Sequence, residues 1–240
     1  MKKVIILCAI IIGSSIISSC SPIVQGAAAV TTVATMENDR RTMGEILDDK
    51  TLLIELGNMV SKDSKFEDAH INFNVYNQSV LITGEVPSDN TKDYLESIVK
   101  SKSLDIKQII NEASVMPKSS YLDRARDGVI SVQVETLFYN QEVFHPRHVS
   151  IHTERGVVYL MGSVTKREAE HATNIASKAK NVKKVVKLFN YLMARPEAEV
   201  ERDNKRKETA EKRAELEAKK AELEAKQNEL NQQLYELGAD

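Results

Sequence analysis

The sequence predicts an α+β protein with two tandem modules, each of order α-β-β-α-β, and a long C-terminal helix. Three observations predict this fold. Segments with apolar residues at helical spacing are interspersed with short segments in which apolar and polar residues alternate as in strands. After Pro196 the composition shifts to Ala, Glu, Lys and Leu. The middle of the chain also repeats itself. Residues that recur 78 positions later are Asp49 as Asp127, Phe66 as Phe144, His70 as His148 and Gly84 as Gly162.

The N-terminus has the order of a secretory signal: basic Lys2 and Lys3, a short apolar run, then small residues before Cys20. The run is shorter than the ~20 residues of a membrane-spanning helix. Residues 1–19 are therefore predicted to be a signal peptide that resembles those of bacterial lipoproteins, with Cys20 as the lipid-anchor residue. An ordinary cleaved signal or an uncleaved anchor is the alternative. Ser21, where an Asp would retain a lipoprotein at the inner membrane, favours the periplasmic face of the outer membrane.

Residues 20–43 are predicted to be a lipidated tether, and residues 44–117 and 118–195 the two modules. In each module two helices are expected to pack on a three-stranded sheet. Turn residues Asn77-Gln78 and Arg155-Gly156 predict a hairpin between the first two strands. Ser88 and Thr165 are the expected N-caps of the second helices, near 90–101 and 166–180. The closing strands are expected near 106–115 and 182–193.

At this point the chain resembles a known family, the BON domain. The residues that carry the resemblance are the segment from Gly156 to Glu170, whose strand runs Val157-Val158-Tyr159-Leu160-Met161-Gly162, and the later Val182-Lys183-Lys184-Val185. Two such copies behind a lipoprotein signal resemble the dual-BON outer-membrane lipoproteins, over about residues 1 to 193. The resemblance implies binding of phospholipid, support of envelope integrity and association with the β-barrel assembly machinery.

The two modules carry opposite charge. Residues 44–118 hold 8 Lys and Arg against 13 Asp and Glu, a net of −5, while residues 119–195 hold 12 against 7, a net of +5. A basic module is attracted to anionic head groups, such as phosphatidylglycerol or cardiolipin, and Arg126 and Arg147 are candidate contacts. Mutual attraction of the two modules is the alternative. The resemblance implies that the first helix of the second module, which is expected to start at about Asp127, meets the bilayer. Its candidate lipid-binding residues are Val129, Ile130, Val132, Gln133 and Leu137.

The outer face of one strand indicates an interface. Val157, Tyr159 and Met161 alternate with the inward Val158 and Leu160. An apolar sheet face without a covering helix suggests a binding surface. The first module is the expected partner and a second protein is the alternative. The second case would make the chain a periplasmic scaffold for envelope proteins.

Catalysis finds little support in the sequence. Zinc-protease and phosphate-loop motifs are absent, and with Cys8 inside the signal no disulfide framework is expected. We therefore predict a non-enzymatic protein with no catalytic residue, no cofactor and no metal. A metal site formed by His148, His152 and Glu154 on one strand face is the weaker alternative. Aromatic residues form no stacking ladder, so no nucleic-acid partner is expected.

Residues 196–240 are predicted to form a charged helix, because Ala, Glu, Lys and Leu favour helices and Glu-Lys pairs recur four residues apart. Leu216, Leu223, Leu230 and Leu237 recur every seven residues. A coiled coil needs a second apolar position in each heptad, and only Leu234 supplies one. An isolated helix and a self-associating coiled coil both remain open.

Overall fold

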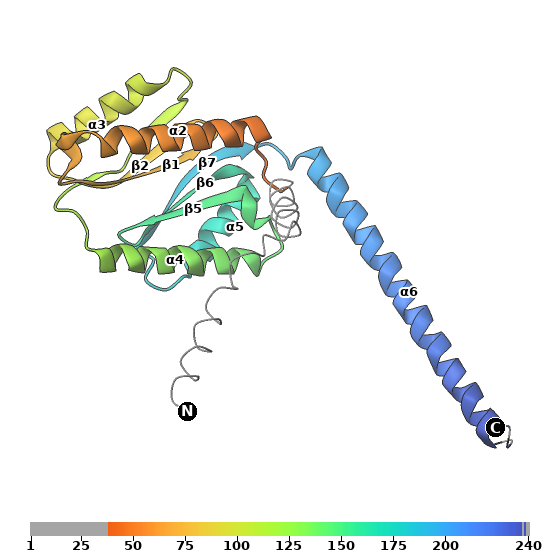
Figure 1. Ribbon diagram of the computed structural model, residues 1–240. Helices are drawn as coiled ribbons and strands as arrows, with labels where there is room; N and C mark the ends of the chain where they lie inside the picture. The colour runs from red at the N-terminus through yellow and green to blue at the C-terminus, as the bar shows by residue number, and fades with distance from the viewer. Residues whose placement is uncertain (1–37, 237, 239–240) are drawn as a thin grey trace, which may run out of the picture. The chain divides into compact units, whose positions relative to one another are not determined.

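The computed structural model describes residues 38–236 and 238 (Figure 1). The predicted signal peptide, Cys20 and most of the tether lie outside the described residues. The chain divides into two units, one extending to Asn190 and one beginning at Tyr191. The first unit contains the first predicted module and the second one up to residue 190, and the second unit contains residues 191–195 and the charged helix.

The first module follows the predicted order. Its elements are α2 (Met43–Ser61), η1 (Ser64–Phe66), β1 (His70–Tyr76), β2 (Ser79–Val86), α3 (Asp89–Lys102), β3 (Gln108–Asn111) and β4 (Ser114–Val115). Strand β2 lies in the centre, antiparallel to β1 and parallel to β3 and β4. The single closing strand predicted near 106–115 is thus two short strands. The break falls at residues 112–113, where the side-chain oxygen of Asn111 accepts a hydrogen bond from the Ala113 N–H at 3.3 Å.

The second module repeats this arrangement with an unbroken closing strand. Its elements are α4 (Tyr121–Tyr139), η2 (Pro146–His148), β5 (Val149–Glu154), β6 (Val157–Thr165), α5 (Lys166–Ala176) and β7 (Lys184–Leu192). The sheet order is β5-β6-β7. Ser88 and Thr165 are the N-caps of α3 and α5, as predicted. The predicted α+β fold with two modules and a C-terminal helix is confirmed.

The recurring aspartate holds the hairpin of each module. Asp127 on α4 is buried, and its two carboxylate oxygens each accept a backbone N–H at 2.8 Å, one from Arg155 and one from Gly156. Asp49 on α2 binds the N–H groups of residues 77 and 78 at 2.6 and 2.8 Å. Both turns have positive φ angles, as two-residue hairpins require. The helix of each module is therefore tied to its hairpin by one carboxylate.

The recurring glycine allows two strands to approach closely. A Cβ at Gly84 would lie 1.9 Å from the carbonyl oxygen of His70, and a Cβ at Gly162 would lie 2.2 Å from that of His148. Both distances are far below van der Waals contact with a backbone atom, so neither position accepts a side chain. The repeat of Gly84 at Gly162 is thus a packing requirement of the β1–β2 and β5–β6 pairs.

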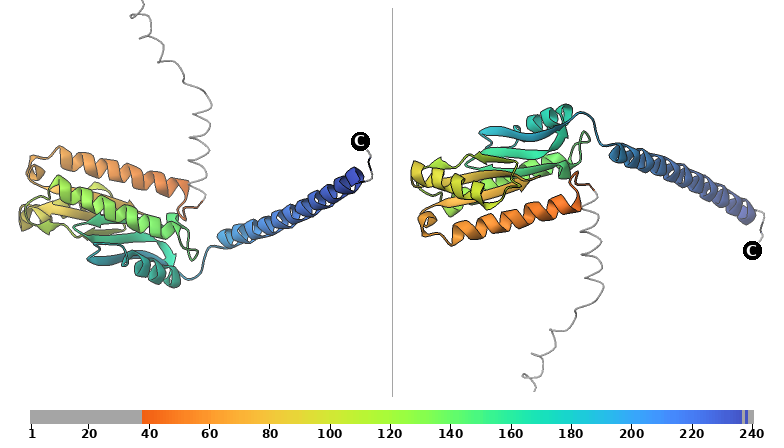
Figure 2. Two further views of the ribbon diagram at one scale, coloured as in Figure 1. Left: turned by 90° about the horizontal axis from the view of Figure 1, so that it is seen from below. Right: turned by 90° about the horizontal axis from the view of Figure 1, so that it is seen from above.

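Three apolar clusters define the layers. One lies between α2, α3 and the first sheet, and another lies between α4, α5 and the second sheet. The third lies between the sheets and contains Tyr76, Leu81, Tyr159 and Met161. We call the contact between the two sheets the seam. Helices α2 and α4 consequently lie on opposite outer sides, α2 above and α4 below the sheets in Figure 1, and Figure 2 shows the same helices from below and from above.

The second unit contains α6 (Glu197–Glu236), which spans 40 residues. Five Lys or Arg side chains within the described part of this helix pair with Glu four residues away, for example Lys219 with Glu215 at 2.6 Å. Leu216, Leu223 and Leu230 are all exposed. Among residues 38–236 and 238, no helix is both long and apolar enough to cross a membrane.

Candidate functional site

The candidate lipid-binding helix, α4, begins earlier than the sequence predicts. Its start was expected near Asp127, whereas the helix begins at Tyr121, and Ser120 caps it by accepting the Asp123 N–H at 3.2 Å. Asp127, Ile130, Val134 and Phe138 form the buried face. Their spacing of three or four residues places them on one side of the helix.

The opposite face of α4 is exposed and uncharged. At about 100° per residue, seven of residues 121–139 fall in the arc facing away from the core, and none of the seven is charged. We call these residues the outer stripe. They are Tyr121, Leu122, Ala125, Val129, Val132, Thr136 and Tyr139. Val129 and Val132 are 58% and 62% exposed. Helix α4 is thus apolar on both faces, which the core does not require.

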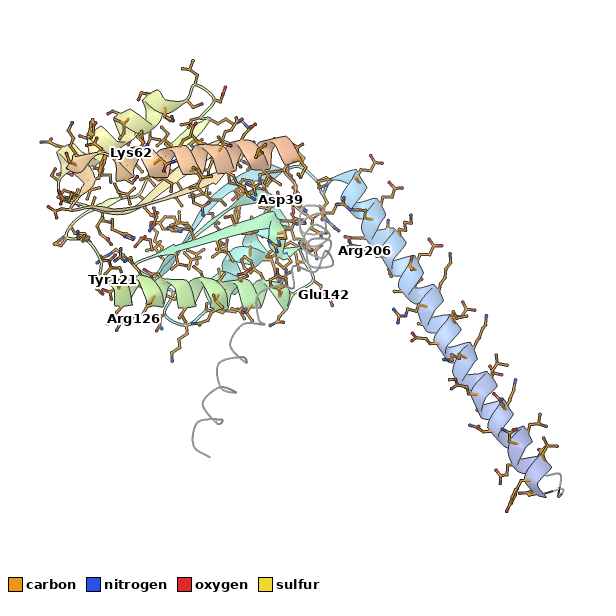
Figure 3. The ribbon with its side chains drawn as sticks, in the orientation of Figure 1. Asp39, Lys62, Tyr121, Arg126, Glu142 and Arg206 are labelled. Carbon is orange, nitrogen blue, oxygen red and sulfur yellow. The ribbon has the colours of Figure 1, made fainter. Side chains whose placement is uncertain are left out.

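Cations flank the outer stripe. Arg126, labelled in Figure 3, is exposed beside it, and its Nη1 lies 2.9 Å from Oδ1 of Asp123. On the same flank Gln133 accepts the backbone N–H of Lys180 at 3.2 Å, which brings the basic loop of residues 178–184 beside α4. The guanidinium of Arg124 lies over the Tyr121 ring, 4.3 Å from its centroid. An apolar stripe with cations along its edge is typical of helices that lie in a membrane interface.

The predicted lipid-binding residues occupy different environments. Val129, Val132 and Arg126 are exposed on or beside the stripe, while Leu137 is half-buried against the core. Ile130 is only 4% exposed and belongs to the core, so we remove it from the candidate set. The sequence treats the apolar residues of this helix as one set, whereas the structure places them on two opposite faces.

Arg147 lies apart from the basic flank, in a groove of about 270 Å³ that it lines with Tyr139 and Pro146. Tyr121, Leu122 and Tyr139 were not predicted as site residues. Their spacing places them on the same helix face as Val129 and Val132. This could have been predicted from the sequence if the helix had been extended back to residue 121.

The seam holds the predicted interface residues. Tyr159 and Met161 are buried there with Tyr76 and Leu81 of the first module, and Val157 packs against them. Burial raises the pKa of Tyr159 to about 12. The Ser163 N–H donates to the Tyr76 hydroxyl at 3.1 Å. This sheet face is therefore covered by the other module within the chain.

One end of the seam is polar. Asn72 donates to Glu154 at 2.8 Å, and Arg155 donates to Glu85 at 3.2 Å. Thr83 Oγ1 and His152 Nε2 are 2.7 Å apart. The sequence placed His148, His152 and Glu154 on one strand face as the weaker metal alternative. His148 instead lies in η2, before the strand begins, and is buried. That combination is therefore wrong.

Residues 38–41 join the two modules. Arg40 makes two hydrogen bonds of 2.8 Å to the carboxylate of Glu168 on α5, and both side chains are buried. Burial alone would raise the pKa of Glu168, but the bonds from Arg40 and Thr165 outweigh it and lower that pKa to about 2. Arg41 pairs with Asp49 at 2.8 Å and stacks over Tyr76.

Comparison with known proteins agrees with this architecture. The BON domain model matches residues 48–117 and 126–193. The chain is 34% identical over 186 residues to the outer membrane lipoprotein DolP of Haemophilus influenzae, covering 77% of this chain and 95% of the relative. It is 29% identical over 156 residues to the 21 kDa hemolysin of Actinobacillus pleuropneumoniae, covering 64% and 79%.

Among solved structures, CdsD, a structural protein of the type III secretion system of Chlamydia trachomatis, matches 65% of this chain and 68% of its own. Its identity is 14% and its TM-score 0.24, values too low to show a shared fold. Neither the BON description nor the lipoprotein name denotes an enzyme, which is consistent with the predicted non-enzymatic role. The name of the Haemophilus relative supports the expected lipid-anchored location at the outer membrane. The chain belongs to the BON-domain family, as a DolP-like outer-membrane lipoprotein with two BON domains.

Proposed function

We propose that this lipoprotein binds the surface of anionic phospholipid membranes through α4 and thereby supports the integrity of the cell envelope. The outer stripe of α4 carries the proposal. It exposes Leu122, Val129 and Val132 without a charge among them, at a place where a water-facing helix would normally be polar.

The geometry suits a helix that lies flat in the head-group region. Such helices bury their apolar face ~5–10 Å into the interface and keep cations at the edge. Burying a valine side chain contributes up to about 1.5 kcal/mol, and a well-placed cation near an anionic surface contributes about 1 kcal/mol. Val129, Val132 and Arg126 together thus support a weak, reversible contact.

A weak contact is sufficient for an anchored protein. A short flexible tether raises the effective concentration of the second binding event to the order of millimolar. With Cys20 acylated, α4 therefore needs only modest affinity of its own. The membrane contact would set the orientation of the modules, while the lipid anchor would set their location.

The experiment uses residues 21–240, which lack Cys20 but keep Arg40 and its bond to Glu168. Flotation with phosphatidylglycerol liposomes is compared with flotation on neutral phosphatidylcholine. Two matched variants are Val132→Glu on α4 and Ile54→Glu at the equivalent position of α2, which are 62% and 64% exposed. We expect selective flotation with phosphatidylglycerol, reduced at least tenfold by Val132→Glu and retained in Ile54→Glu.

Circular dichroism checks that both variants are folded. Equal loss in the two variants would remove α4 as the specific contact. Absence of flotation by the unmodified chain would leave Cys20 as the sole membrane contact and sink the proposal.

A second candidate function is protein binding through α6. The sheet face that would serve a scaffold is covered in the seam, but Leu216, Leu223 and Leu230 are exposed along α6. We propose self-association through this stripe. Sedimentation of residues 21–240 tests it: a dimer that becomes a monomer in Leu223→Lys supports it, and a monomer throughout rejects it. Association with the β-barrel assembly machinery stays a prediction.

A further inference from the structure

The polar end of the seam gathers metal-ligating side chains from both modules. His70 and Glu85 stand opposite each other on β1 and β2. Glu154 is the last residue of β5 in the second module. One ligand atom of each lies within 4.8 Å of those of the other two. This spacing is short enough for a single ion to contact all three.

Glu154 has an unsatisfied oxygen at this place. The residue is 6% exposed. Its Oε2 accepts the hydrogen bond from Asn72 at 2.8 Å, whereas its Oε1 is buried without a hydrogen-bond partner among the residues that the structure describes. A buried polar atom left without a partner costs about 1–3 kcal/mol, and more when it is charged. Burial accordingly raises the pKa of Glu154. A cation would supply the missing partner.

There is room for an ion with bound water. A cavity of about 310 Å³ is lined by His70, Asn72, Asp127, His152 and Glu154, among others. Nε2 of His152 lies 4.0 Å from Oε2 of Glu154, just outside the three candidate ligands.

The three side chains are partly prepared for this role. Nδ1 of His70 lies 3.3 Å from Oε2 of Glu85. Oε2 of Glu85 also accepts the Ser119 N–H at 2.9 Å, and its Oε1 accepts Arg155 at 3.2 Å. Such supporting hydrogen bonds orient ligands around a metal. Arg155 also offsets part of the negative charge of Glu85. The imidazole of His70 adds a nitrogen to the two carboxylates, so the site would favour an ion that takes nitrogen as well as oxygen.

We propose that His70, Glu85 and Glu154 form a binding site for a divalent transition-metal ion that bridges the two BON modules. One imidazole and two carboxylates suit Zn²⁺, which binds His and Glu and can keep a water as its fourth ligand. Ca²⁺ and Mg²⁺ prefer all-oxygen sites. The ion would fasten the seam, since each module supplies at least one ligand.

The experiment titrates Zn²⁺ into untagged residues 21–240 by calorimetry, after dialysis against chelator. We expect one Zn²⁺ per chain, no comparable binding of Ca²⁺, and a Tm that rises with Zn²⁺ because the ion binds the folded state. Glu154→Gln should weaken Zn²⁺ binding at least tenfold and abolish the rise in Tm. His171→Gln, at a histidine outside the cluster, should change neither.

Misfolding cannot imitate this result. Glu154→Gln removes a buried carboxylate with an unpaired oxygen, so the metal-free variant should be at least as stable as the parent chain. Stoichiometric Zn²⁺ binding that survives Glu154→Gln, or no binding by the parent chain, would overturn the proposal. Neither outcome depends on liposomes, so the result is independent of the proposed lipid-binding function.

Discussion

Helices α2 and α4 occupy the same position in the two modules, yet their outer faces differ. Both bury an aspartate that ties down a hairpin. On the outer face of α4, apolar residues run from Leu122 to Tyr139, whereas on α2 they end at Ile54 and give way to Asn58 and Ser61. The inner faces of both helices must pack on a sheet and so stay similar, whereas the outer faces are not constrained by the core and can differ. The divergent face is therefore where specific function is to be sought.

Charge follows the same division. Arg126 beside the outer stripe corresponds to Asp48 on α2, in the repeat of 78 residues. The basic second module would attract an anionic surface and the acidic first module would be repelled by it. Exposed apolar residues alone, which α2 has in part, are thus a weaker indicator of membrane binding than exposed apolar residues together with positive charge.

The largest expected effect tests what the two helices share. Asp127→Ala leaves two hairpin N–H groups without their acceptor, and Asp49→Ala does the same in the first module. Because hydrogen bonds to a charged group contribute ~1.5–3 kcal/mol each, both variants should lose about 3 kcal/mol or more in the free energy of unfolding. Urea denaturation measures it. A loss of less than ~1 kcal/mol in the free energy of unfolding of either variant would show that the hairpin is stable without the aspartate.

The second effect is specific to the second module. Since the pKa of Glu168 is lowered to about 2, its contribution to stability is complete above the unfolded pKa of ~4.3 and is lost as the pH falls toward 2. Stability should fall by about 2 kcal/mol between pH 5 and pH 3 through this group alone. Urea denaturation of Glu168→Gln at both pH values should show a smaller fall.

Thr91, which follows the N-cap of α3 as Glu168 follows that of α5, provides the control. Thr91→Ala has no carboxylate to titrate and should keep the pH dependence of the parent chain. An unchanged pH slope in Glu168→Gln would mean that other carboxylates account for the acid sensitivity.

The smallest effect tests the contribution of charge beside the outer stripe separately from that of its apolar residues. Arg126→Asp should weaken flotation with phosphatidylglycerol by up to about thirtyfold, because it changes two units of charge at ~1 kcal/mol each. Asp48→Arg on α2 should strengthen it by less. Both effects should shrink at 0.5 M salt, where screening is strong. If the two changes have equal and opposite effects, the whole surface charge, and not α4, controls binding.

The repeat predicted most of the fold, because its identities mark constrained positions. Gly84 and Gly162 recur where strands nearly touch, and the turn residues at 77–78 and 155–156 adopt the positive φ angles that hairpins need. The boundaries of α4 were less predictable. Its first turn is exposed, so residues 121–126 supply no core periodicity from which to recognise it.

The candidate sites depended on information that one sequence does not hold. Ile130 and Val129 are neighbours of similar hydropathy, and only the position of Asp127 in the core shows which faces inward. The group of His70, Glu85 and Glu154 arises because two sheets meet face to face. Its members are far apart in the sequence, so no local spacing could have indicated them.

The paired arginines at residues 40 and 41 have a mechanical consequence. Arg40 is bonded to α5 of the second module, and the next residue, Arg41, is bonded to α2 of the first. A pull arriving along the chain from its N-terminal side is therefore shared by both modules before α2 begins. Such a load enters both modules at once and does not reach the second module through the seam alone. A lateral force on the lipid anchor would therefore load the two modules together.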